Sequence, residues 1–130
     1  MLVEARNLAR QALTLTRQSC DVRPFVLGLV AFATAMRNQL REDTPARGLE
    51  GLLPPALLAR LAATRFAPST IALWLGTLLR GYRDAGELEP MLAPTLESSL
   101  NQLTAALGGC ERIAAEAALG QLAPQPGAHL

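Results

Sequence analysis

The amino-acid sequence predicts an all-α protein in which about five helices form a small bundle. Half of the 130 residues are hydrophobic but only 4% are aromatic, so any core is built mainly from Leu, Ala and Val. Ala and Leu are strong helix formers, whereas the residues typical of strands are scarce here. Apolar residues also recur every three or four positions between breaks that contain Pro or Gly, which indicates amphipathic helices within a single domain.

The first predicted helix runs from Leu2 to about Ser19. Its apolar face carries Ala5, Leu8, Ala9, Ala12 and Leu15. Arg6, Arg10 and Arg17 follow one edge of its polar face, at spacings of four and seven. This edge is either a solvated surface or a basic stripe that faces lipid headgroups, a carboxylate partner or a permeating anion. Three arginines do not decide between these interpretations.

The second predicted helix opens at Pro24, because proline suits the first helical turn. Its strongest face carries Phe25, Leu29, Phe32, Met36 and Leu40. Residues 26–35 are apolar on nearly every side, and such a helix is usually buried centrally or packed between subunits. We therefore expect Leu29 and Phe32 to lie at the centre of the packing.

A loop and two further helices follow. Residues 42–55 are rich in Pro, Gly and charge, which predicts a loop with one short turn, and a short helix runs from Pro55 to Arg65. Ala67-Pro68-Ser69 breaks that helix, and we expect Ser69 to cap the fourth helix, which ends at Asp84. Its apolar stripe is Ile71, Trp74, Leu75, Leu78 and Tyr82. Trp74 and Leu78 are predicted core or interface residues.

The fifth helix is predicted to begin at Leu88 or Pro94 and to end at Leu107. Its leucine stripe is Leu92, Leu96, Leu100, Leu103 and Leu107, of which we assign Leu96 and Leu103 to the core. Gly108-Gly109 is predicted to stop the helix, as glycine after a helix commonly does. Residues 114–119 could add one turn, and residues 121–130 read as a disordered tail.

Nothing in the composition predicts an enzyme, a cofactor, a metal site or nucleic-acid binding. The net charge of +1 offers no basic surplus, the two cysteines form no ligand cluster, and the single histidine, His129, lies in the tail. Cys110 beside Arg112 lacks a base or a second thiol, so we read it as structural. The longest uncharged apolar run, residues 24–36, is too short to span about 30 Å of hydrocarbon.

Several stretches together resemble the bacterial bestrophin family of ion channels. The most specific is Leu107-Gly108-Gly109-Cys110-Glu111-Arg112-Ile113, which follows Leu100-Asn101-Gln102-Leu103-Thr104-Ala105-Ala106. A second stretch is Arg6-Asn7-Leu8-Ala9-Arg10-Gln11. Supporting stretches are Leu52-Leu53-Pro54-Pro55 and Leu73-Trp74-Leu75. The resemblance covers residues 2–113. We assign residues 1–113 to a bestrophin-like cytoplasmic helical region and expect residues 114–130 to form a divergent, disordered tail.

The resemblance implies a homopentameric channel that often conducts chloride or other anions, with this region in the cytoplasmic vestibule on the inner side of the bacterial membrane. We expect a channel fragment that lacks the membrane spans and does not conduct alone, derived from a truncated gene, a frameshift or an excision. The alternative is a soluble helical protein–protein interaction module. The partners implied are copies of the chain itself or other helical segments.

Overall fold

The computed structural model describes the backbone of residues 2–122 and the side chains of residues 3–109. The elements of this part are five α-helices: α1 (Leu2–Leu15), α2 (Arg23–Leu40), α3 (Pro55–Ala62), α4 (Ala67–Asp84) and α5 (Ala93–Leu122). Within these residues the β-type pairing is one isolated bridge between Thr16 and Leu88. The predicted all-α fold with about five helices is confirmed.

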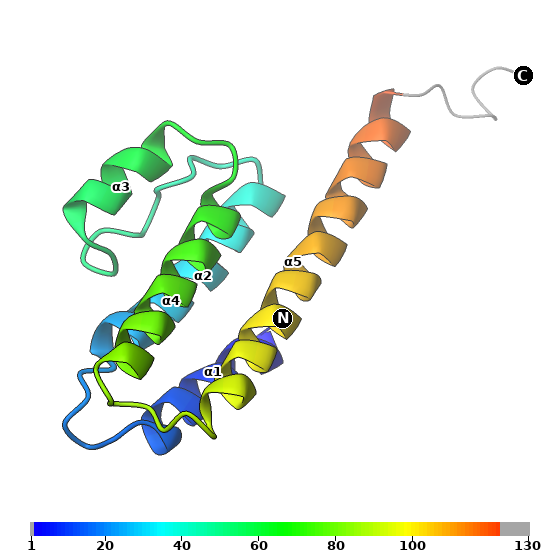
Figure 1. Cartoon of the computed structure of the whole chain (residues 1–130). Coiled ribbons are helices and arrows are strands. Elements are labelled where there is room, and N and C mark those ends of the chain that lie inside the picture. The colour runs from blue at the N-terminus through cyan, green and yellow to red at the C-terminus, as the bar shows by residue number, and fades with distance from the viewer. Residues whose placement is uncertain (1, 123–130) are drawn as a thin grey trace, which may run out of the picture.

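Four of the helices form a ring of neighbours. Helix α1 packs against α2 and α5, and α4 packs against the same two helices. The short helix α3 lies to one side, near one end of α4, and the C-terminal part of α5 extends beyond the other helices (Figure 1). Short connections join α1 to α2 and α4 to α5, which makes each of these pairs antiparallel.

The core lies at the centre of this ring and draws on all five helices. Its largest fully buried side chains are Leu8, Phe25, Phe32, Met36, Leu49, Leu61, Ile71, Leu75, Leu88, Leu96 and Leu103, together with Asn38. Leucine dominates and the aromatic contribution is small, as the composition requires. The helices therefore present their apolar stripes to one another, which is the main source of their stability.

Proline, rather than a capping hydroxyl, marks the start of three helices. Prolines occupy the first or second helical position of α2, α3 and α4, and none of these helices has a side-chain hydrogen bond from its N-cap. The prediction that Ser69 caps the fourth helix is wrong. Pro68 is already pre-organised for the first helical turn, so α4 begins at Ala67 and Ser69 lies inside it.

Two helices end earlier than the sequence pattern predicts. Helix α1 ends at Leu15 rather than Ser19, because the backbone beyond it pairs with the connection between α4 and α5. There the amide of Arg17 donates to the carbonyl oxygen of Glu87 at 2.8 Å. Helix α3 ends at Ala62 rather than Arg65, and the amides of Ala63 and Thr64 close it with tight turns.

The prediction that Gly108-Gly109 ends the last helix is wrong. Helix α5 begins at Ala93 and runs through both glycines to Leu122. A glycine stop requires the left-handed backbone, and among residues 2–122 the glycines with positive φ are Gly48, Gly51 and Gly86. In a helical backbone, each glycine costs only about 1 kcal/mol relative to alanine, which neighbouring helix formers offset. Residues 114–122 of the predicted tail continue helix α5, and residues 123–130 lie outside the described residues.

Candidate functional site

In the first predicted motif, residues 6–11, some side chains lie in the core, some line a groove and others are exposed to solvent. Leu8 is fully buried, and the Gln11 side-chain oxygen accepts a hydrogen bond of 2.6 Å from the hydroxyl of Ser99 on α5. Arg6 and Ala9 line a groove between α1 and α2. Asn7 and Arg10 are exposed. The motif thus serves both the packing of α1 and the surface of the bundle.

The predicted core and interface residues lie in or against the core. Buried among them are Phe25, Leu29, Phe32, Met36, Leu96 and Leu103. Trp74 and Leu78 are half-buried and pack against this cluster from α4. Helix α2 is less enclosed than its composition suggests, because Val30 is 49% exposed on its outer side. The second helix therefore keeps an apolar strip at the surface.

The second predicted motif, residues 107–113, lies within α5. Leu107 is buried, whereas Gly108 is exposed and a Cβ added there would meet nothing within 4 Å. Gly109 is half-buried. The side chains of Cys110, Glu111 and Arg112 lie outside the described residues. The described part of the motif acts as a continuous stretch of helix rather than as a turn.

The described side chains contain no group of three or more His, Cys, Asp or Glu residues that could hold a metal ion. A thiol, that of Cys20, lies in the connection between α1 and α2. Burial raises its pKa, and the nearby negative charge of Glu87 raises it further. A thiol held in its protonated form is a poor nucleophile, so this position offers no activated cysteine.

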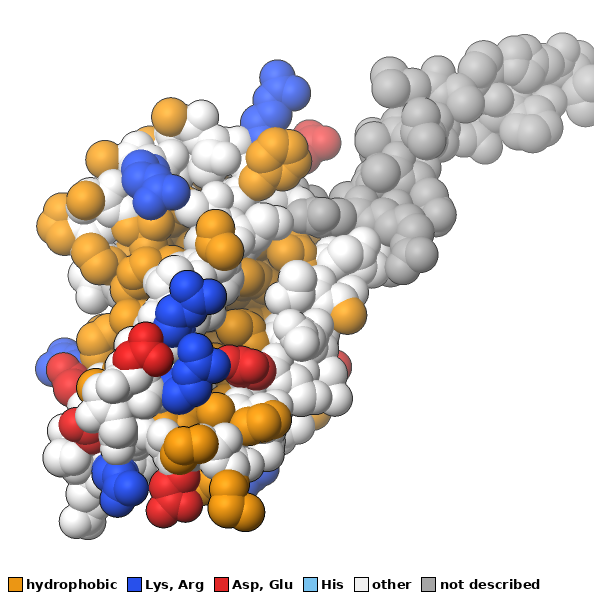
Figure 2. All heavy atoms as spheres, viewed as in Figure 1, with side chains coloured by type: hydrophobic (Ala, Val, Ile, Leu, Met, Phe, Trp, Pro, Cys, Tyr) orange, Lys and Arg blue, Asp and Glu red, His pale blue; other side chains and the backbone are white. Residues whose placement is uncertain are grey.

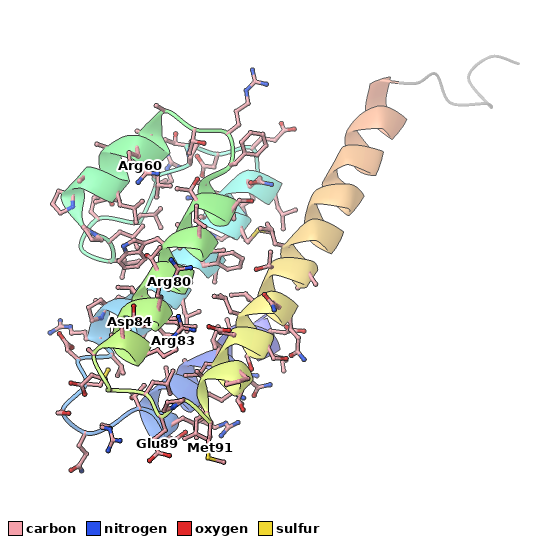
Figure 3. The ribbon with its side chains drawn as sticks, viewed as in Figure 1. Arg60, Arg80, Arg83, Asp84, Glu89 and Met91 are labelled. Atoms are coloured by element: carbon pink, nitrogen blue, oxygen red, sulfur yellow. The ribbon has the colours of Figure 1, made fainter. Side chains whose placement is uncertain are left out.

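A cluster of polar contacts ties two connections together at one end of the bundle. The guanidinium of Arg17 donates to the carbonyl oxygen of Gly86 at 2.8 Å, and the hydroxyl of Ser19 lies 2.7 Å from the Glu87 carboxylate. The Tyr82 hydroxyl donates to the carbonyl oxygen of Asp21 at 3.0 Å. Figure 3 shows Arg83, Asp84, Glu89 and Met91 near this end of the molecule. These contacts set the position of α1 relative to α4.

An apolar groove, here called the α1–α2 groove, runs between the first two helices. Its volume is about 320 Å³. Its lining is Ala5, Arg6, Ala9, Val26, Leu29, Val30, Ala33, Thr34 and Arg37. Apart from one threonine, its polar residues are the two arginines. Sequence reasoning singled out Arg6 but not Arg37, although Val26, Val30, Ala33 and Arg37 share a helical spacing that identifies them as one face of α2.

A second hollow, the α4–α5 groove, lies between the last two long helices and has a volume of about 510 Å³. Its lining is Ser69, Ala72, Leu73, Gly76, Thr77, Arg80, Leu100, Asn101 and Thr104. Leu73 is 71% exposed at its edge. Figure 2 shows hydrophobic side chains between α4 and α5, beside a mixed group of basic and acidic side chains. One such pair joins Arg83 to Glu97 at 3.5 Å.

The described residues form a helical bundle. Its surface carries apolar grooves, and polar contacts join its helices and their connections. Within residues 2–122 no helix is both long enough and apolar enough to cross a membrane. Residues 1–116 match the family described as Bacterial/Fungal Bestrophin protein. The chain belongs to this bestrophin family.

Comparison with individual proteins agrees with this assignment. The chain is 40% identical, over 116 residues, to a voltage-dependent anion channel-forming protein of Ralstonia nicotianae, covering 87% of this chain and 38% of the relative. It is 34% identical to a voltage-dependent anion channel-forming protein of Escherichia coli K12, and the match covers 88% of this chain and 38% of that relative. A bestrophin homologue from Klebsiella pneumoniae superimposes with a TM-score of 0.81 at 31% identity, covering 98% of this chain and 45% of that chain. This chain therefore spans less than half the length of each of these relatives.

Proposed function

We propose that this region is the cytoplasmic helical part of a bestrophin-type anion channel. The observation that carries the proposal is the superposition of 98% of this chain on the Klebsiella pneumoniae bestrophin homologue with a TM-score of 0.81. The names of the relatives from Ralstonia and Escherichia, which describe anion channel-forming proteins, support chloride or another anion as the permeating ion. By family resemblance, the region works at the cytoplasmic side of the bacterial inner membrane.

We infer that residues 2–122 alone do not conduct. Their helices turn the large apolar side chains of α2, α4 and α5 into their own core, as the burial of Phe32, Ile71 and Leu96 illustrates. Side chains used in this core are not available to face lipid, which is the surface that a conducting pore needs. Conduction then depends on membrane segments supplied by the rest of a channel.

A chimeric channel tests the proposal. Residues 1–116 of this chain replace the matching segment of the Ralstonia nicotianae relative, and chloride efflux is measured from proteoliposomes. We expect efflux comparable with that of the unaltered relative. A second chimera carrying Leu103→Asp, which places a charge in the core, is expected to lose assembly and efflux together. A chimera that assembles in the membrane yet passes no chloride would contradict the proposal.

Self-association is the second part of the proposal, with a pentamer as the assembly that the family resemblance implies. Sedimentation velocity on the assembled chimera in detergent measures the number of copies directly. A single species of five copies is the expected result. A monomeric chimera that still passes chloride would contradict the pentamer without contradicting the channel assignment.

One observation favours an alternative, a helical protein–protein interaction module. Leu73 is 71% exposed beside the α4–α5 groove, and a large apolar side chain at a hollow is a common feature of partner surfaces. If the chain binds a helical partner in solution, Leu73→Ser is expected to weaken that binding. Leu13→Ser is the matched control, because Leu13 is 60% exposed and lies outside this groove.

A further inference from the structure

The α1–α2 groove combines an apolar wall with an unusual distribution of charge. Its lining contains two arginines and no acidic residue. Neither Arg6 nor Arg37 forms an ion pair or a side-chain hydrogen bond with any residue that the structure describes. The hydroxyl of Thr34, the other polar group of the lining, already donates to the carbonyl oxygen of Val30 at 2.9 Å. The groove therefore presents positive charge and apolar surface.

The antiparallel packing of α1 and α2 brings the two arginines to the same end of the groove. Arg6 lies near the N-terminal end of α1, which packs beside the C-terminal part of α2 where Arg37 lies. Long helical side chains lean toward the N-terminal end of their own helix, so Arg6 leans toward the end of the groove that carries Arg37, and Arg37 leans back toward Arg6. Two like charges held near one end favour an anion between them.

The opposite end of the groove is apolar. The part of α2 that lines the groove runs from Val26 to Arg37. These positions are eleven residues apart, a length of about 16 Å at 1.5 Å per residue. Val30 lies midway along this wall and is 49% exposed. The backbone groups of the two helices are already hydrogen-bonded within the helices, so the groove offers no backbone hydrogen bonds to an extended peptide. An alkyl chain needs no hydrogen bonds. A volume of about 320 Å³ lies at the lower end of the range for small-molecule sites.

We propose that the α1–α2 groove binds an anionic single-chain amphiphile of the fatty-acid type. Its carboxylate lies between the guanidinium groups of Arg6 and Arg37, and its alkyl chain follows Val30 toward Val26. The occupant is thus a small amphiphile rather than a second copy of the chain or an acidic peptide. This proposal rests only on the described helices and does not depend on the proposed channel function.

Titration of the full chain with dodecanoate, kept below its micelle concentration and followed by calorimetry and amide NMR shifts, tests the site. We expect saturable one-to-one binding with shifts confined to α1 and α2. Arg6→Gln combined with Arg37→Gln is expected to weaken binding about tenfold, the scale of two partly exposed charge pairs. A neutral dodecyl maltoside is expected to bind the wild-type chain more weakly by a similar factor.

Arg10→Gln combined with Arg41→Gln is the matched control, because it removes the same charge from α1 and from the residue directly after α2, at exposed positions outside the groove lining. It is expected to leave dodecanoate binding unchanged, and thermal unfolding verifies that both double variants fold. Equal weakening in the two double variants, or the absence of saturable binding, would overturn the proposal. So would an oligomer of the wild-type chain that the Arg6/Arg37 variant converts to a monomer, because a second copy would then occupy the groove.

Discussion

The side-chain amide of Asn38 donates to the carbonyl oxygen of Arg47 at 2.9 Å, and also to that of Pro45 at 3.2 Å. Asn38 belongs to α2 and is 1% exposed, whereas its two partners lie in the loop between α2 and α3. A single buried amide therefore holds this loop against the bundle. The loop in turn places Leu49, which is fully buried, into the core.

The substitution Asn38→Ala is expected to lower the free energy of unfolding by about 2 kcal/mol, because it leaves the carbonyl oxygens of Pro45 and Arg47 without their hydrogen-bond donor. Urea unfolding followed by the fluorescence of Trp74 measures this change. Cleavage by trypsin after Arg47 is expected to accelerate in the variant. The exposed Asn7→Ala is the control and is expected to change stability by less than about 0.5 kcal/mol.

Gly28 of α2 packs tightly against side chains of α4. A Cβ at this position would lie 2.7 Å from Cδ2 of Leu75 and 2.7 Å from Cζ3 of Trp74. Gly28→Ala is therefore expected to destabilise the protein by about 1–3 kcal/mol through overpacking, despite its better helix propensity. Gly81→Ala, where a Cβ meets nothing within 4 Å, is expected to stabilise it by about 0.5–1 kcal/mol. Thermal midpoints that shift in the same direction would contradict this account.

Phe32 and Phe66 form a matched pair for testing the core. Phe32 is 0% exposed and Phe66 is 63% exposed. Phe32→Ala is expected to cost about 3–5 kcal/mol, the usual range for a buried phenylalanine, whereas Phe66→Ala is expected to be near neutral. Chemical denaturation measures both. A Phe32 variant as stable as the Phe66 variant would show that α2 does not organise the core.

Tyr82 is expected to make stability depend on alkaline pH. Burial raises the pKa of this phenol to about 12, with further contributions from Cys20 and Asp21. The folded state keeps the proton between pH 10 and 12 while the unfolded state loses it, so this contribution is complete below about pH 10 and is lost as pH rises toward 12. Because the chain has one tyrosine, its tyrosinate absorbance reports this group alone. A midpoint near 10 for the folded chain would contradict the assignment.

Gly108 and Gly86 distinguish a glycine inside a helix from a glycine in a turn. Gly108 lies within α5, whereas Gly86 has a φ of +74°. Gly108→Ala is expected to raise helical content and stability by about 0.5–1 kcal/mol. Gly86→Ala is expected to lower stability by about 1 kcal/mol or more, because alanine is strained there. Far-UV circular dichroism on the two variants measures both effects. A loss of helix in the Gly108 variant would indicate a stop at this glycine.

The sequence by itself determined the all-α class and the faces that the helices bury. Helical spacing predicted the stripe of Phe25, Phe32 and Met36, because a residue every three or four positions lies on one side of a helix whatever packs against it. The resemblance carried by residues 6–11 and 107–113 predicted the bestrophin family, and the match over residues 1–116 confirms it.

The tertiary structure alone decided how the helices pair and where they end. Periodicity identifies a buried face but not its partner, so placing Arg6 and Arg37 in the lining of one groove required the packing of α1 on α2. The early end of α1 depends on backbone pairing between Thr16 and Leu88, which are far apart in sequence. Gly108 does not stop α5, because a stop depends on a left-handed backbone that glycine permits but does not impose.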